Sequence, residues 1–198
     1  MKVTSTNGVK VEMYDLGGSG PNMLLSHANG FHGLCWKPVA EHLIKHFHCH
    51  SFDHRGHGDT PAPKDWTVAW AGYAADASAA AKSIAEPKGI IGVGHSMGGA
   101  TLLMAAIKDP TLFRGLLLYE PIVKPDDVRM PANRPNNLAE GAARRKKSFK
   151  SFEEAIENYS NKMPMTHFTP EALEAYVRGG FTQAEDGTVH LKCDPALE

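Results

Sequence analysis

Residues 94–99 read GHSMGG, and this short segment constrains the fold more than any other part of the chain. It follows the apolar run 89–93 and precedes 100–106, which is rich in alanine and leucine. A strand, a tight glycine-rich turn and a helix in this order force the central residue into a strained backbone conformation. The helix then directs its free amides at the same point. The segment therefore predicts that Ser96 is a nucleophile at the carboxyl edge of a sheet.

Strand-like and helix-like segments alternate through the first 121 residues. Apolar or alternating segments predict strands, and long segments with helical spacing or many alanines predict helices. The expected strands are 9–14, 22–27, 48–52, 89–93 and 113–121, and the expected helices are 36–47, 66–84 and the run from the turn to 108. This alternation predicts the α/β class, with a mostly parallel central sheet and helices on both of its faces.

The composition changes after residue 121. Prolines and asparagines crowd 125–137, and 148–162 has helical spacing behind a serine cap at Ser148 or Ser151. A threonine and proline at 169–170 begin a further helix. We expect residues 1–121 to form the core and 122–198 a helical cap, inserted within one structural domain.

Three landmarks in order resemble the α/β-hydrolase superfamily: HANG at 27–30 with Trp36 downstream, DHRGHG at 53–58, and the turn at 94–99. The resemblance covers about residues 10–121. It implies the α/β-hydrolase fold and a serine hydrolase that cleaves carboxylic esters, with a lipase as the nearest variant. Because the turn carries a serine, the resemblance implies an acyl-serine intermediate rather than the aspartate chemistry of dehalogenases and epoxide hydrolases. No cofactor is implied, and the expected partner is a small ester.

The resemblance also assigns roles to individual residues. Ser96 matches the nucleophile, and the backbone amide of Met97 matches the main oxyanion donor. Asn29 falls at the position of the second donor, although Ala28 replaces the usual glycine before it. Phe31 is the alternative second donor.

The acid and the base of such a site normally follow the last strands of the sheet. Here no strand pattern follows the expected cap, so we expect these strands to be missing and the chain to be a truncated hydrolase with weak activity. Glu120 is a candidate acid, and His167 and His190 follow it in the required order. The alternative is that Glu120 is a polar residue at the end of a strand and that both histidines are surface residues of the cap. The alternative function is a non-catalytic short form or fragment that binds an apolar ligand or partner. Truncation would also expose a sheet edge, through which the chain could self-associate.

Histidines and charged residues elsewhere allow other interpretations. His46, His48 and His50 alternate along an expected strand, so a metal patch is conceivable, but no metal-protease pattern accompanies them and we expect no metal site. Asp53 and Arg55 are expected to brace a loop through hydrogen bonds and an ion pair. His95 is expected to pack and hydrogen-bond beneath the turn rather than act as the base.

Composition excludes several classes. Lys and Arg total 21 and Asp and Glu total 22, a net charge of −1 that would not collect nucleic acid, and the basic run 144–147 is expected to be a solvated helix face. Cys35, Cys49 and Cys193 are odd in number and lack CxxC spacing, which argues against disulfides and structural zinc. No apolar run approaches the ~20 residues that span a bilayer, and no signal peptide is evident, so we expect a cytoplasmic protein.

Overall fold

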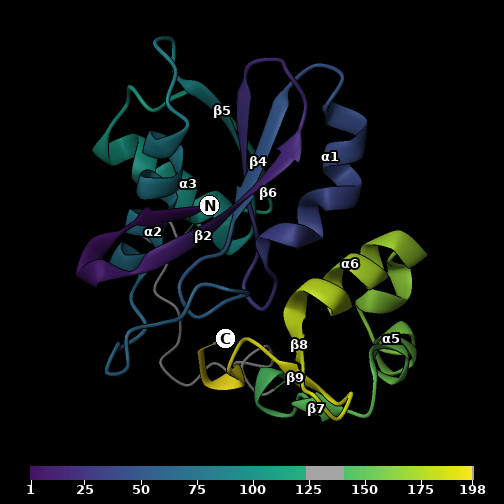
Figure 1. Ribbon diagram of the computed structural model, residues 1–198. Coiled ribbons are helices and arrows are strands. Elements are labelled where there is room, and N and C mark those ends of the chain that lie inside the picture. The colour runs from purple at the N-terminus through teal and green to yellow at the C-terminus, as the bar shows by residue number, and fades with distance from the viewer. Residues whose placement is uncertain (124–140, 198) are drawn as a thin grey trace.

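Six strands form one sheet in a computed structural model that describes residues 1–123 and 141–197 (Figure 1). Their order across the sheet is β1-β2-β4-β3-β5-β6. The strands are β1 (Lys2–Thr4), β2 (Lys10–Gly17), β3 (Asn22–Ser26), β4 (His48–Phe52), β5 (Ile90–His95) and β6 (Phe113–Tyr119). The pairs β4–β3, β3–β5 and β5–β6 are parallel, whereas β1 and β2 are antiparallel to their neighbours. The expected mostly parallel sheet is confirmed.

Helices cover both faces of this sheet (Figure 1). They are α1 (Lys37–Leu43) on one face and α2 (Trp70–Ser83) with α3 (Met97–Lys108) on the other. Short 3-10 turns are η1 (Thr6–Gly8), η2 (Gly33–Trp36), η3 (Met165–His167) and η4 (Pro195–Leu197). The helix expected over 36–47 is shorter than predicted and follows η2, with Pro38 in its first turn, where the missing amide hydrogen costs nothing.

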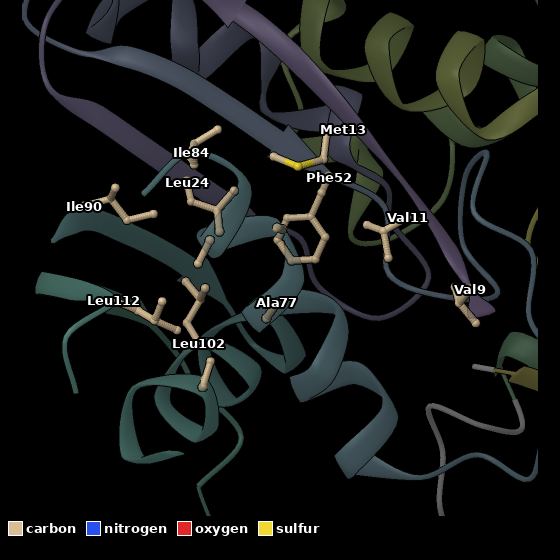
Figure 2. Packing of buried hydrophobic residues seen from close by; sticks show 13 residues of the cluster. Val9, Val11, Met13, Leu24, Phe52, Ala77, Ile84, Ile90, Leu102 and Leu112 are labelled. Atoms are coloured by element: carbon tan, nitrogen blue, oxygen red, sulfur yellow. The ribbon is translucent and has the colours of Figure 1, made fainter. Parts of the chain in front are cut away.

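The larger core lies between the sheet and the α2–α3 layer. Figure 2 shows Leu24 and Phe52 of the sheet facing Ala77 of α2 and Leu102 of α3, and all four side chains are fully buried. The alanines of α2 are small enough to let the helix approach the sheet closely. This explains why the helix packs in the core although its sequence is only weakly amphipathic.

The cap is not purely helical, which corrects the expectation. Beside α5 (Phe152–Ser160) and α6 (Pro170–Gly180) it contains a three-stranded antiparallel sheet of β7 (Ser148–Phe149), β9 (Val189–Leu191) and β8 (Phe181–Gln183). Gly187, at φ 87°, makes the turn that pairs β8 with β9. Ser151 and Thr169 cap α5 and α6 as predicted. The proline-rich stretch 125–137 lies outside the described residues.

The cap packs on the loop that follows β3. Phe31 of that loop joins the apolar cluster built by α5, α6 and the small sheet. The His32 Nε2 atom lies 2.9 Å from the carbonyl oxygen of Tyr176 on α6, and Lys192 Nζ lies 2.8 Å from Asp59 Oδ1. Core and cap are therefore joined by apolar packing, a buried hydrogen bond and an ion pair.

Among the described residues, β6 is paired on one side only. Leu117 and Tyr119 on this strand are 66% and 62% exposed. The open sheet edge expected from the sequence is thus present. No helix in 1–123 or 141–197 is both long and apolar enough to cross a membrane.

Candidate active site

Ser96 stands between the last residue of β5 and the first residue of α3, with φ 52° and ψ −115°. This conformation is strained for any residue with a side chain. The neighbouring glycines explain how the chain accommodates it. A Cβ on Gly94 would lie 2.6 Å from the Cα of Gly99, and a Cβ on Gly98 would fall on the carbonyl oxygens of the loop after β3. Only glycine fits at both positions, so the segment forms the tight strand-to-helix turn that the sequence predicts.

Backbone hydrogen bonds hold this turn in place. The Ser96 amide donates to the Tyr119 carbonyl oxygen at 2.9 Å, and the Ser96 carbonyl accepts from the amides of Ala100 at 3.1 Å and Ile122 at 3.2 Å. Its side chain is partly exposed, and its hydroxyl has no hydrogen-bond partner within 1–123 and 141–197. No hydrogen bond within the described residues therefore restrains the Ser96 hydroxyl.

The predicted oxyanion loop leaves the same edge of the sheet as the turn. Ser26, at the end of β3, pairs in register with Gly94 of the neighbouring parallel strand β5. The loop then turns tightly, with the Phe31 amide donating to the Ala28 carbonyl oxygen at 3.1 Å and Gly30 at φ 73°. Met97 is the first residue of α3, where an amide has no intrahelical acceptor. The structure thus brings the two predicted donor segments together, on adjacent strands.

His57 contacts the Asn29 side chain, a relationship that the sequence did not reveal. Its Nε2 atom lies 3.0 Å from Asn29 Oδ1, and its Nδ1 atom lies 3.2 Å from the Arg55 carbonyl oxygen. Burial lowers the pKa of His57 to about 4, so the ring is neutral and carries a single N–H. The ring can donate to only one of the two oxygens, so an Asn29 amide turned to donate its NH₂ would satisfy both contacts.

Two further histidines beneath the loop are engaged in structural contacts. The His27 Nδ1 atom lies 2.8 Å from the Ala28 carbonyl oxygen, and its Nε2 accepts from the His54 amide at 3.0 Å. His54 Nε2 lies 3.0 Å from the Ser26 hydroxyl. Burial lowers the pKa of both rings well below the usual range, and neighbouring histidines lower it further. These rings support the loop in the neutral form.

Glu120 follows β6 directly, has φ 44° and is exposed. Its carboxylate raises the pKa of His95, but burial lowers that pKa by more, so the net shift is downward. The His95 ring packs near the rings of Tyr119 and Phe31, with centroids 5.2 and 6.5 Å away. The expected packing of His95 is present, whereas the expected hydrogen bond is not among the contacts of the described residues.

Neither of the other two candidate bases is hydrogen-bonded to Ser96 in the described residues. His190 lies in β9, where its Nδ1 is 2.8 Å from the Ser148 hydroxyl of the cap sheet. His167 is an exposed residue at the end of η3. Within the described part of the chain, no hydrogen-bonded chain links Ser96 to a histidine and a carboxylate.

The loop at 53–58 braces the site as predicted. The Asp53 carboxylate accepts from the Tyr14 hydroxyl at 2.6 Å and from the amides of Gly33 at 2.6 Å and Asp59 at 2.7 Å. Burial raises the pKa of Asp53 to about 6, although each of these hydrogen bonds lowers it. The carboxylate ties the loop after β4 to the loop after β3.

Arg55 forms the expected ion pair, and the structure identifies its partner as Asp76 of α2. The Arg55 Nη2 and Nε atoms lie 2.7 and 2.9 Å from the two carboxylate oxygens, and both side chains are fully buried. The Trp66 ring stacks beside the guanidinium, 5.5 Å from its central carbon. Such a closed pair is structural.

A cavity with space for about one water lies between the loop after β3 and the cap. Phe31 and His32 line it from the core, and Arg145, Tyr176 and Phe181 line it from the cap. Arg145, in the basic run expected to be solvated, is partly buried and donates to the Tyr176 hydroxyl at 2.6 Å. The run is therefore not wholly a solvated face.

Two of the three alternating histidines, for which no metal site was expected, gather with a carboxylate instead of with His46. His48 and His50 lie together with Asp15, and the donor atoms of all three are within 4.8 Å of one another. His46 is exposed and outside this group. Asp15 was missed because it lies on a strand 33 residues away from His48, and only strand pairing brings the two together.

The chain matches known proteins in sequence and fold. A family model described as "Alpha/beta hydrolase family" matches residues 23–195. Protein phosphatase methylesterase 1 of Bos taurus is 32% identical over 152 residues, which are 73% of this chain and 38% of that protein. Pimeloyl-[acyl-carrier protein] methyl ester esterase of Aeromonas salmonicida is 28% identical over 111 residues, 55% of this chain and 40% of that protein. The matched region thus spans less than half the length of these curated relatives.

Solved structures share the fold. The crystal structure of E-2-(acetamidomethylene)succinate hydrolase superposes with a TM-score of 0.75 at 20% identity, over 100% of this chain and 71% of that one. A thioesterase domain from the curacin biosynthetic pathway superposes with a TM-score of 0.76 at 17% identity, over 100% of this chain and 74% of that one. At such identities the likeness is one of architecture.

Proposed function

Because the chain belongs to the alpha/beta hydrolase family, we propose that it is a serine hydrolase that cleaves carboxylic esters through an acyl intermediate on Ser96. The observation that carries this proposal is the backbone of Ser96, whose φ of 52° and ψ of −115° place a partly exposed serine on a strained turn at the start of a helix. A structural serine gains nothing from such strain, whereas a nucleophile gains exposure and access to the helix amides.

The proposed reaction has two steps. The Ser96 oxygen attacks the ester carbonyl carbon, and the carbonyl oxygen becomes an anion that the amides of Met97 and Asn29 stabilise. The alcohol leaves with a proton, and the acyl group stays on Ser96 until water releases it as the acid. The contact of His57 with the Asn29 side chain supports the second amide by holding its loop in place.

Proton transfer limits this chemistry. A serine hydroxyl needs a histidine to accept its proton, and within the described residues no histidine is hydrogen-bonded to Ser96. We propose Glu120 as the acid, because it directly follows Tyr119, which pairs with His95 at the end of β5. Because no described histidine is hydrogen-bonded to Ser96, we expect these residues to support slow acylation at most.

Small esters are the proposed substrates. The two curated relatives are named as a methylesterase and a methyl ester esterase, so their printed names point to esters of a small alcohol.

A fluorophosphonate probe tests the nucleophile directly. We expect covalent labelling of Ser96 that disappears in Ser96→Ala, with slow p-nitrophenyl acetate turnover that disappears in the same variant. Labelling that persists in Ser96→Ala would contradict the assignment. Turnover within about tenfold of an efficient esterase would contradict the expected absence of a complete triad.

A non-catalytic role is the second candidate, and the incomplete triad among the described residues favours it. In this case the protein binds an apolar ligand or partner at the unfinished site around Ser96. Folded protein that binds a fluorescent fatty acyl probe yet shows no fluorophosphonate labelling would support this role against the enzyme.

We also propose that β6 mediates self-association. Its free edge can pair with β6 of a second copy in an antiparallel, two-fold arrangement, which would cover Leu117 and Tyr119. Sedimentation velocity should show a concentration-dependent dimer that Leu117→Lys abolishes. A monomer at every concentration tested would rule this out.

A further inference from the structure

Asp15, His48 and His50 form a cluster at the end of the sheet opposite Ser96. His48 is the first residue of β4, whereas Ser96 follows the last residue of β5, and β4, β3 and β5 run parallel. The two ends of these strands are separated by the length of the sheet. The cluster therefore belongs to no part of the proposed ester site.

Strand pairing places the three side chains on one face. His48 and His50 are two residues apart on β4, so both point to the same side of the sheet. Asp15 on β2 is the direct register partner of His50. A register shift between Asp15 and Gly17 bends β2 at this point, and the Gly17 amide donates to Asp15 Oδ1 at 2.9 Å. The carboxylate is thereby fixed toward the histidines.

The distances are short enough for one shared ion. His48 Nε2 lies 2.9 Å from Asp15 Oδ1, the two imidazole rings are 4.2 Å apart at their centroids, and all three donor atoms lie within 4.8 Å of one another. Ligands about 2.0–2.2 Å from a common tetrahedral centre are separated by about 3.5 Å, so small side-chain rotations suffice.

The donor atoms suit a cation. A carboxylate oxygen of Asp15 and one ring nitrogen of each histidine can all offer a lone pair to the same ion. Asn22 Oδ1 lies 3.3 Å from His50 Nε2, so an N–H at Nε2 can donate to it and leave the lone pair of Nδ1 for the ion, as outer partners do in metal sites.

We propose that Asp15, His48 and His50 bind one transition-metal ion of the zinc class, which clamps β2 to β4. Two imidazoles and one carboxylate match the preferences of Zn²⁺, Co²⁺ and Ni²⁺ rather than those of Mg²⁺ or Ca²⁺, which take oxygen ligands. Water completes the coordination, because Asp15 is 63% exposed. The site is structural and independent of the hydrolase proposal.

Isothermal titration calorimetry with ZnCl₂ on the full chain tests the site, with MgCl₂ as a control ion. We expect one Zn²⁺ per chain, no heat from Mg²⁺, and a melting temperature that rises with Zn²⁺ concentration. His48→Gln, His50→Gln and Asp15→Asn should each weaken Zn²⁺ binding by at least about tenfold.

His46→Ala is the matched control, because His46 is exposed two residues from His48 and lies outside the cluster. It should leave the affinity unchanged. The proposal is overturned if Zn²⁺ does not bind stoichiometrically, or if His46→Ala weakens binding as much as His48→Gln does, which would indicate capture by scattered surface histidines. Circular dichroism of each variant without metal shows whether a loss of binding comes from a loss of fold. If the buried substitution His50→Gln unfolds the protein, His48→Gln still tests the site, because His48 is partly exposed.

Discussion

The Ser96 amide donates a 2.9 Å hydrogen bond to the carbonyl oxygen of Tyr119, which ties the strained turn residue to the last residue of β6. The Ile122 amide in turn donates to the Ser96 carbonyl oxygen at 3.2 Å, so the turn and the segment after β6 are joined by two hydrogen bonds. A backbone with φ 52° is held by its surroundings rather than by its own preference. The edge strand β6 is thus part of what presents the hydroxyl.

Replacing Ser96 with glycine should relieve this strain. We expect Ser96→Gly to unfold with a free energy about 1 kcal/mol above that of Ser96→Ala, since glycine adopts positive φ without steric cost. Urea unfolding of the two variants measures the difference. If the alanine variant proves as stable as the glycine variant, the turn is not strained.

Gly98 allows α3 to approach the loop after β3. A Cβ at this position would fall on the carbonyl oxygens of Ser26 and His27, which are backbone atoms and cannot rotate away. Gly98→Ala should therefore cost roughly 3 kcal/mol of stability, in the range of overpacked cores, and should reduce fluorophosphonate labelling by displacing the Met97 amide. Gly115→Ala in β6 is the control, because a Cβ there meets nothing within 4 Å, and it should change stability little. Equal effects of the two substitutions would refute the steric argument.

Acid should destabilise the protein through its buried histidines. The pKa of His32 and of His57 is lowered to about 4, first by burial, whereas unfolded histidine titrates near 6.5. The unfolded state then binds more protons than the native state between these values, so stability is full above about pH 6.5 and is lost toward pH 4. At pH 5, His32 and His57 should each lower the free energy of unfolding by roughly 2 kcal/mol. The lowered pKa values of His27 and His54 act in the same direction.

Asp53 opposes this trend. Its pKa is raised to about 6 by burial, so its ionised form costs stability above that pH and protonation relieves the cost as the pH falls toward 3.8. One carboxyl offsets only part of four histidines, and we expect a net loss of stability from pH 7 to pH 5. Urea midpoints measured across this range should fall less steeply in His57→Gln than in the unaltered protein. An identical slope in both would show that His57 is not buried in the neutral form.

The ion pair of Arg55 and Asp76 should be costly to break. Both side chains are fully buried, so Asp76→Ala leaves an uncompensated guanidinium and should cost about 3–5 kcal/mol. The exposed pair of Lys82 and Asp109 provides the comparison, and Lys82→Ala should cost less than about 1 kcal/mol. Thermal unfolding of both variants decides the matter, and a loss from Asp76→Ala as small as that from Lys82→Ala would mean that water reaches the pair.

Local patterns were sufficient to predict most elements of the core. The bounds of β4 and the caps Ser151 and Thr169 agree with the sequence, because strand hydrophobicity and capping chemistry act over a few residues. The small sheet of the cap was missed. Its strands have two or three residues each, too short for a periodic signal, and β7 joins the sheet only through pairing with β9, where Ser148 and His190 are 42 positions apart.

The sequence alone determined the turn around Ser96, because glycines at 94 and 98 are a local requirement of a backbone that L-residues avoid. It also determined the order of strands and helices, and so the family. Only the tertiary structure decided which partners those residues meet: Asp76 for Arg55, Asn29 for His57, and Asp15 for His48. Each of these pairs joins residues 21 to 33 positions apart, and their contact depends on strand register and helix packing, which no local pattern specifies.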